Sequence, residues 1–219
     1  MKLLALDTAT ERCSVALWLD GATLTRQTEA PRAHAELILP MVDEVLREAG
    51  LRLRDLDALV YGRGPGAFTG VRIAIGVVQG LAYAAALPVV GISNLRAVAQ
   101  ASGAAGQVLV CMDARMNEVY WCAYRADQEG LMQPTMTERL SSPDAVDVDA
   151  ASVEVIMGRG LSAYPQLGVR YARAVQHPGA LPHAREMALL AVPEVRAGRT
   201  QRAQDASPVY LRDQVVATR

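Results

Sequence analysis

The chain has 219 residues, of which 51% are hydrophobic, and its formal net charge is −1. This length leaves room for one large or two small domains, and the apolar content excludes a disordered chain. The balanced charge excludes a chain-wide basic surface for nucleic acid. Arginines become more frequent toward the C-terminus, which is more typical of a solvated face than of a phosphate-binding track: Arg196, Arg199, Arg202, Arg212 and Arg219.

The N-terminus and the cysteines predict a cytoplasmic protein. Only four apolar residues precede Asp7, too few for a signal peptide. Arg72 interrupts the most apolar segment, so no membrane span is expected. Cys13, Cys111 and Cys122 are an odd number without CxxC spacing, which is typical of buried free thiols in a reducing compartment.

The first hundred residues predict a hairpin followed by alternating helices and strands. Strands are expected at 3–9, 13–19 and 22–29, with Asp20-Gly21 as a hairpin turn. The alternation that follows indicates right-handed crossovers and parallel strands. Its expected elements are helix 34–49, strand 57–61, helix 69–86, strand 88–93 and a helix from Asn94.

The second half repeats this pattern after a run of small residues at 102–106. The expected strands are 107–114, 118–124, 131–139 and 152–158, and short helices are expected near Leu161 and Arg185. Because three strands followed by mixed α/β segments occur twice, the sequence predicts two α/β lobes, residues 1–103 and 104–204. A single continuous mixed sheet is the alternative.

The segment GRGPGAFTGVR, residues 62–72, lies between a predicted strand and a predicted helix, where phosphate is often bound. The loop has no lysine, and Lys2 is the only one in the chain, so a Walker-type site is excluded. The glycine spacing excludes a dinucleotide fingerprint. Either Thr69 caps the helix and the N–H groups of the next two residues bind an anion, or Gly64 and Gly66 only permit a tight turn.

Other signs of chemistry are sparse. His34, His177 and His183 are too far apart to predict a zinc site, and no GxSxG elbow accompanies a serine or cysteine nucleophile. Asp7 and Asp113 each end a predicted strand, where carboxylates bind magnesium in some proteins. Aspartate at a strand end is more often ordinary turn chemistry.

Two predicted helices are more apolar than packing on one sheet requires. The apolar residues of helix 34–49 spread over half its circumference, and between Val71 and Ala86 only Arg72 and Gln79 are strongly polar. Gly76 and Gly80 form a small-xxx-small step that lets another helix approach closely. This pattern favours a protein partner at these helices over coverage by the other lobe.

Several segments, in this order, resemble the TsaB (YeaZ) family over nearly the whole chain: LDTATERCSVALW, GRGPGAFTGVRIA, PVVGISNL, MDARMNEVY, GRGL and PVYLR. That family is the non-catalytic bacterial partner of TsaD in threonylcarbamoyladenosine synthesis on tRNA. The resemblance implies the actin-like ATPase superfamily fold, with two RNase H-like lobes and residues 205–219 packing back on the first lobe.

The resemblance also implies that the chain has no catalytic residue, metal or cofactor. Where TsaD carries two metal-binding histidines, this sequence has Asn94 and Val98, which are poor metal ligands. The first phosphate loop has Ala9 in the glycine position, and the second, Asp113–Met116, has no glycine. The loops are therefore interpreted as vestigial at Asp7, Thr8, Gly64, Gly66 and Asp113.

The mechanism implied by the resemblance is docking of helices 35–49 and 71–86 onto matching helices of TsaD. TsaE and tRNA would be reached only through the complex, and the isolated chain would form a homodimer. The residues expected at the interface are Leu37, Met41, Val45, Val71, Ile75, Gly76, Val78, Gln79, Gly80 and Ala82. Two alternatives stay open: an autonomous actin-like ATPase or phosphotransferase that uses Asp7, Gly64, Gly66 and Asp113, and a metallopeptidase.

Overall fold

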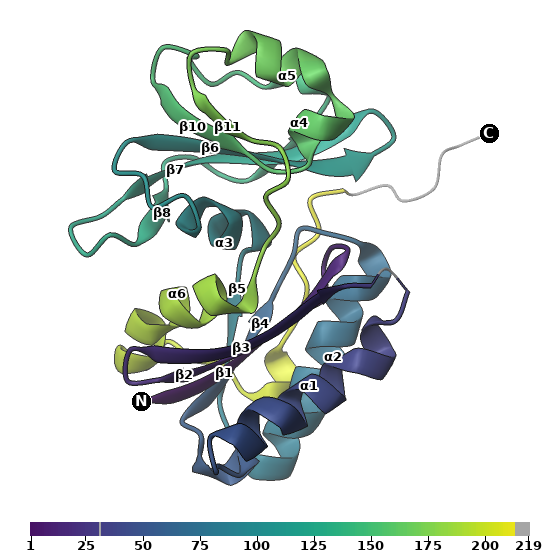
Figure 1. Cartoon of the computed structure of the whole chain (residues 1–219), viewed down its shortest axis with the longest axis vertical. Coiled ribbons are helices and arrows are strands. Elements are labelled where there is room, and N and C mark those ends of the chain that lie inside the picture. Colours follow the sequence, from purple (N-terminus) through teal and green to yellow (C-terminus); the bar gives the residue numbers. More distant parts are fainter. Residues whose placement is uncertain (31, 213–219) are drawn as a thin grey trace. The chain divides into compact units, whose positions relative to one another are not determined.

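The computed structural model describes residues 1–30 and 32–212 of the chain. It divides into two compact units (Figure 1). The first unit comprises residues 1–97 and 181–208, and the second comprises residues 98–180 and, at the C-terminal end of the described chain, residues 209–212. Each unit is built on its own mixed sheet. The expectation of two α/β lobes is therefore confirmed, and the alternative of one continuous sheet is wrong.

The sheet of the first unit has the order β3-β2-β1-β4-β5. Its first three strands form an antiparallel meander, and β4 and β5 continue the sheet in parallel with β1. The hairpin register pairs Ala5 with Ala16, and the parallel register pairs Leu4 with Leu59. The strands are β1 (Lys2–Asp7), β2 (Arg12–Leu19), β3 (Ala22–Glu29), β4 (Ala58–Gly62) and β5 (Val89–Ile92).

Helices cover both faces of this sheet. Figure 1 shows α1 (His34–Glu48) and α2 (Phe68–Ala85) on one face and α6 (Ala184–Arg196) on the other. Successive side chains of a strand point to opposite faces of the sheet. Because the apolar residues of β1 are buried one after another, both faces of this strand are apolar and buried. Leu4 and Leu6 belong to the core beneath α1 and α2. Two short 3₁₀ helices complete the unit, Leu53–Asp55 and Ala203–Asp205.

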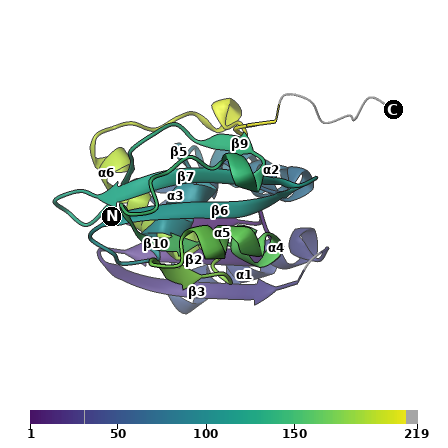
Figure 2. The same cartoon turned by 90° about the horizontal axis from the view of Figure 1, so that it is seen from above.

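The second unit repeats the strand order of the first. Its sheet runs β8-β7-β6-β10-β11, with β6 to β8 antiparallel and β10 and β11 parallel to β6, and β9 pairs with β7. Figure 2 shows the short helices α4 and α5 lying over β6 and β10. The elements are β6 (Gln107–Arg115), β7 (Glu118–Ala126), β8 (Met132–Pro134), β9 (Arg139–Ser141), the 3₁₀ helix Pro143–Ala145, β10 (Val153–Met157), α4 (Gly160–Ala163), α5 (Pro165–Arg170) and β11 (Val175–His177).

The division between the units differs from the one expected from the sequence. The boundary falls within α3 (Asn94–Gln100), a few residues before 103, and the chain returns to the first unit at Leu181 instead of at residue 205. The cause is α6, whose buried side chains Met187 and Leu190 cover the sheet face opposite α1. The chain from Val209 groups with the second unit, and residues 213–219 of the expected returning segment lie outside the described residues.

Most of the predicted long elements are confirmed. The strand expected at 131–139 is wrong, because only Met132–Pro134 and Arg139 of it lie in strands, and the short helix expected near Arg185 is the 13-residue α6. Helix α5 and strands β9 and β11 were not predicted. Strands of three residues carry too little alternation to be recognised. By length and composition α2 is able to cross a membrane despite Arg72. Its buried residues, which include Val71, Ile75 and Val78, pack in the core of the first unit, and this packing accounts for the apolar residues on the buried side of the helix.

Candidate functional site

The glycine loop (residues 62–70) is bonded to the loop between β1 and β2 (residues 8–11, the β1–β2 loop). The Ala67 N–H donates a hydrogen bond to the Ala9 carbonyl over 2.7 Å. The Thr8 hydroxyl, which is fully buried, donates to the Gly70 carbonyl over 2.6 Å. The glycine loop and the β1–β2 loop are thus bonded to one another.

Close packing explains the glycines of this loop. A Cβ atom at Gly66 would lie 2.6 Å from the Ala9 carbonyl oxygen, and one at Gly70 would overlap the Thr8 carbonyl oxygen. The predicted cap at Thr69 is wrong, because the N-cap of α2 is Ala67 and its carbonyl accepts the Val71 N–H over 2.9 Å. The tight-turn interpretation of the loop is therefore the better supported one.

Asp7 lies at the end of β1 with no exposed surface. Its Oδ1 accepts a hydrogen bond from the Asn94 amide over 2.7 Å, and its Oδ2 has no partner among the described residues. The Asn94 Oδ1 in turn accepts the Gly64 N–H over 2.8 Å. Burial raises the pKa of Asp7 to about 7, opposed by the Asn94 hydrogen bond and by the charge of Arg12. Asn94 thus connects Asp7 to the glycine loop.

Asp113 lies near the end of β6 in the second unit, where it stabilises a turn. Its Oδ1 accepts the Arg115 N–H over 2.8 Å and the Tyr164 hydroxyl over 3.3 Å, and its Oδ2 pairs with the Arg115 guanidinium over 3.0 Å. Residues 115–117 of this turn have positive φ, at 61°, 54° and 59°, a conformation that non-glycine residues rarely adopt. Asp113 therefore has the local turn role that the sequence favoured.

The histidines do not converge on a metal site. Within residues 1–30 and 32–212, no three His, Cys, Asp or Glu side chains are grouped to hold a metal ion. His34 Nε2 donates to the Thr10 carbonyl over 2.8 Å, and His183 caps α6 by accepting the Arg185 N–H over 2.9 Å. Burial lowers the pKa of His183 to about 4, so its imidazole is neutral at pH 7.

The cysteines are unsuited to nucleophilic chemistry. All three are buried as free thiols, as the sequence predicts. Burial raises the pKa of Cys13 and of Cys122 to about 11 and raises that of Cys111 further. Because the thiolate is the nucleophile, a thiol with a raised pKa is unreactive at pH 7.

The structure corrects the residues expected at the partner interface. Gly76 and Gly80 are exposed, and Leu37 and Gln79 are partly buried. The other expected contacts are buried in the core of the first unit, so the opposite side of each helix faces outward. The buried residues are Met41, Val45, Val71, Ile75, Val78 and Ala82. Gln79 is engaged within the unit, since its amide donates to the Ala206 carbonyl over 3.1 Å.

The exposed side of α1 and α2 carries large apolar side chains and two glycines. We call these residues together the outer face. Tyr83 is 86% exposed, Phe68 53% and Leu39 49%. Gly76 and Gly80 lie between the two α2 residues, and a Cβ atom added to either glycine would meet no atom within 4 Å. The outer face thus combines anchors for a partner with two glycines where a second helix backbone fits closely.

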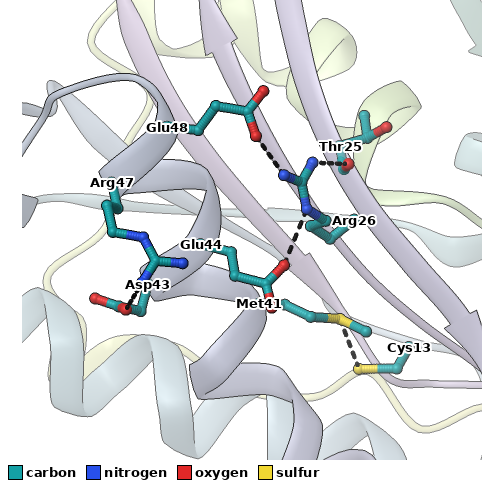
Figure 3. Close-up of polar contacts among 8 residues, drawn as sticks. All are labelled: Cys13, Thr25, Arg26, Met41, Asp43, Glu44, Arg47 and Glu48. Atoms are coloured by element: carbon teal, nitrogen blue, oxygen red, sulfur yellow. Dashed lines mark hydrogen bonds and ion pairs between the residues drawn. The ribbon is translucent and has the colours of Figure 1, made fainter.

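Arg26 of β3 fastens the C-terminal half of α1 (Figure 3). Its guanidinium donates to Glu44 over 3.0 Å and also to Glu48, so one side chain spans two carboxylates a helical turn apart. Beneath α1, the Cys13 thiol lies 3.9 Å from the Met41 sulfur. Helix α1 is therefore attached to both β2 and β3.

Three of the C-terminal arginines form ion pairs within the chain. Arg199 pairs with Glu194 over 2.7 Å, Arg202 with Asp205 over 2.8 Å, and Arg212 with Glu118 over 2.5 Å. Arg219 lies outside the described residues. Arg199 and Arg202 are exposed, in agreement with the solvated face that the sequence favoured, whereas the side chain of Arg212 is largely buried.

The two repeats of one strand order, each with helices on its sheet, define a two-lobe α/β protein of the actin-like, RNase H-like class. A family model described as "TsaD: tRNA N6-adenosine threonylcarbamoyltransferase" matches residues 24–158. The Escherichia coli (strain K12) protein named "tRNA threonylcarbamoyladenosine biosynthesis protein TsaB" is 43% identical, and the match covers 98% of this chain and 96% of that protein.

A Haemophilus influenzae protein of the same name is 42% identical, with 98% of this chain and 95% of that protein covered. The solved structure "YeaZ from Pseudomonas aeruginosa" superposes with a TM-score of 0.86 at 42% identity, covering 96% of this chain and 99% of that chain. The chain belongs to the TsaB (YeaZ) family.

Proposed function

We propose that this chain is a non-catalytic scaffold subunit in the bacterial synthesis of tRNA threonylcarbamoyladenosine, and that it binds and stabilises a TsaD enzyme. The names of its relatives, "tRNA threonylcarbamoyladenosine biosynthesis protein TsaB", support the pathway. The TsaD family model matches a region that contains α1 and α2. A TsaD protein with equivalent helices is therefore a natural partner for this surface.

The outer face is the observation that carries the proposal. Exposed aromatic and aliphatic anchors around small residues are typical of protein interfaces, and the two open glycines fit close approach of a helix. Two helices supply the roughly 800 Å² per partner that a standard interface buries. In the absence of TsaD, the same face would pair with a second copy of the chain.

Three features support a subunit that does no chemistry itself. The described residues hold no metal-ligand group, and the thiols have raised pKa values. The main-chain groups of Gly64, Ala67 and Gly70 in the glycine loop are bonded to the β1–β2 loop or to Asn94. Transfer of the threonylcarbamoyl group would take place on TsaD in the cytoplasm, with TsaE and tRNA contacted through the complex.

The decisive experiment compares the mass of complexes by light scattering for the chain alone, with TsaD, and with TsaD and ATP. The test variant is Gly76→Glu with Gly80→Glu, because both positions have room for a side chain in the folded chain. A control matched in charge is Ala163→Glu with Gln166→Glu, at exposed positions of the second unit. We expect the wild type and the control to form a one-to-one complex with TsaD and the test variant to stay apart.

Complex formation by the glycine variant as tight as that of the wild type would refute the assignment of the outer face. A wild-type chain that ignores TsaD but binds magnesium and ATP would refute the scaffold role. It would favour the alternative of an autonomous ATPase.

A further inference from the structure

The N-terminal ends of α1 and α2 both rest on the β1–β2 loop. His34, the first residue of α1, donates through Nε2 to the Thr10 carbonyl over 2.8 Å. At the start of α2, Ala67 donates to the Ala9 carbonyl and the Thr8 hydroxyl donates to the Gly70 carbonyl. Three consecutive residues of one loop therefore bond to both helices that carry the outer face.

Neither helix start has an ordinary side-chain cap. The N-cap residues of α1 and α2 are Ala33 and Ala67, and neither makes a side-chain cap hydrogen bond. Alanine has no side-chain oxygen to accept the N–H groups of the first turn. Each helix start is instead attached to the β1–β2 loop by the tertiary bonds described above.

The contacts leave little freedom at the loop. Thr8 and Ala9 are completely or almost completely buried. The absence of space for a Cβ atom at Gly66 or Gly70 shows that the glycine loop and the β1–β2 loop are in direct backbone contact. A shift of the β1–β2 loop would therefore move the start of α2, and His34 would transmit it to α1.

We propose that the β1–β2 loop positions α1 relative to α2 for partner binding, with Thr8 and His34 as the positioning residues. This inference rests on the proposed function, because it assigns the vestigial phosphate loop a role at the TsaD-binding surface. The loop sets the distance between the helix starts, so that Leu39 on α1 and Tyr83 on α2 meet the partner at a fixed spacing.

The test variant is Thr8→Val, which keeps the shape of the side chain and removes the hydroxyl donor. Thr8→Ser restores the donor. The matched control is Ser14→Ala: the buried Ser14 hydroxyl accepts the Ala184 N–H over 3.0 Å and so fastens the start of α6 on the other face of the same sheet. Each of Thr8→Val and Ser14→Ala removes one hydrogen bond between a buried hydroxyl group and the start of a helix. Only the Thr8 hydroxyl bonds to a helix that carries the outer face.

Two readouts separate positioning from stability. The first is the Kd for TsaD by calorimetry, at a temperature where urea unfolding shows every variant to be folded. The second is the distance distribution between nitroxide labels at Asp43→Cys and Ala84→Cys, two exposed positions on α1 and α2. The native cysteines are buried, so the introduced ones carry the labels.

We expect Thr8→Val to weaken TsaD binding at least tenfold and to broaden the distance distribution. Thr8→Ser should bind within twofold of the wild type, and Ser14→Ala should change neither readout. Wild-type binding by Thr8→Val, or an equal loss of binding in Ser14→Ala, would overturn the inference. If Thr8→Val does not fold, His34→Phe takes its place. This substitution removes the donor to the Thr10 carbonyl and keeps an aromatic ring, and the same two readouts are expected to change in the same direction.

The label distances also separate this inference from the proposed function. A wild-type chain that does not bind TsaD refutes the proposed function. In that case a broadened distribution in Thr8→Val still supports the role of the loop in helix placement, and an unchanged distribution overturns it.

Discussion

Replacement of Asp7 by asparagine tests whether the buried carboxyl group of Asp7 is protonated in the folded chain. The pKa of Asp7 is raised from 3.8 to about 7, mainly by burial, so the folded chain keeps a proton that the unfolded chain has already released. Between these two values the unfolded state binds fewer protons, and the free energy of unfolding falls as the pH rises. At 1.36 kcal/mol per pKa unit, the loss by pH 8 is roughly 4 kcal/mol.

The asparagine side chain is neutral at every pH and retains an oxygen that accepts the Asn94 amide. We therefore expect Asp7→Asn to match the wild type near pH 4 and to be more stable by up to roughly 4 kcal/mol at pH 8. The assay is urea unfolding from pH 4 to pH 8. In a Trp121→Phe background the single remaining tryptophan, Trp18, reports on the first unit.

The control for this experiment is Asp43→Asn, which removes an exposed carboxylate on α1. Its stability curve should run parallel to that of the wild type. If the Asp7→Asn curve is also parallel to the wild type over this range, the Asp7 carboxylate is ionised in the folded chain and the reasoning from burial is wrong.

Four further substitutions probe packing and hydrogen bonds. Gly70→Ala should destabilise the chain by about 3 kcal/mol or more in urea unfolding, because its Cβ atom overlaps the Thr8 carbonyl. Gly76→Ala in the same helix should instead raise the free energy of unfolding by about 1 kcal/mol, and a loss would show that the site is crowded. Tyr61→Phe removes the acceptor of the Ser207 N–H and should cost about 1 kcal/mol in the same assay. Arg170→Met removes three bonds to backbone carbonyls of residues 143–146, so amide hydrogen exchange in the adjoining loop should accelerate, and unchanged rates would contradict this role.

Most helices and strands could be predicted from short stretches of sequence, because residue types and their spacing over a few positions determine secondary structure. Short runs rich in apolar residues identified the long strands, and the hairpin signal at Asp20-Gly21 agrees with the turn between β2 and β3. The missing lysine in the glycine loop is likewise a local signal, and it predicts that the loop is not a Walker-type site. The chain order of hairpin and alternating segments was also enough to predict two lobes.

Other features depended on contacts between residues distant in sequence. The sequence of α2 is apolar on nearly every side, so its periodicity did not reveal that Val78 faces the sheet and Gly76 faces outward. Only packing against β4 decides that orientation. Membership of α6 in the first unit depends on burial against strands more than 160 residues earlier.

The amino-acid sequence by itself determined the elements, their order and the absence of standard phosphate-binding chemistry, because these follow from residue types and short spacings. The tertiary structure decided which faces are buried and how the loops use their polar groups. Burial and hydrogen bonding depend on neighbours that the chain brings together only on folding. Asp7 illustrates the difference: its position at a strand end was readable from the sequence, whereas its raised pKa and its bond to Asn94 exist only in the folded chain.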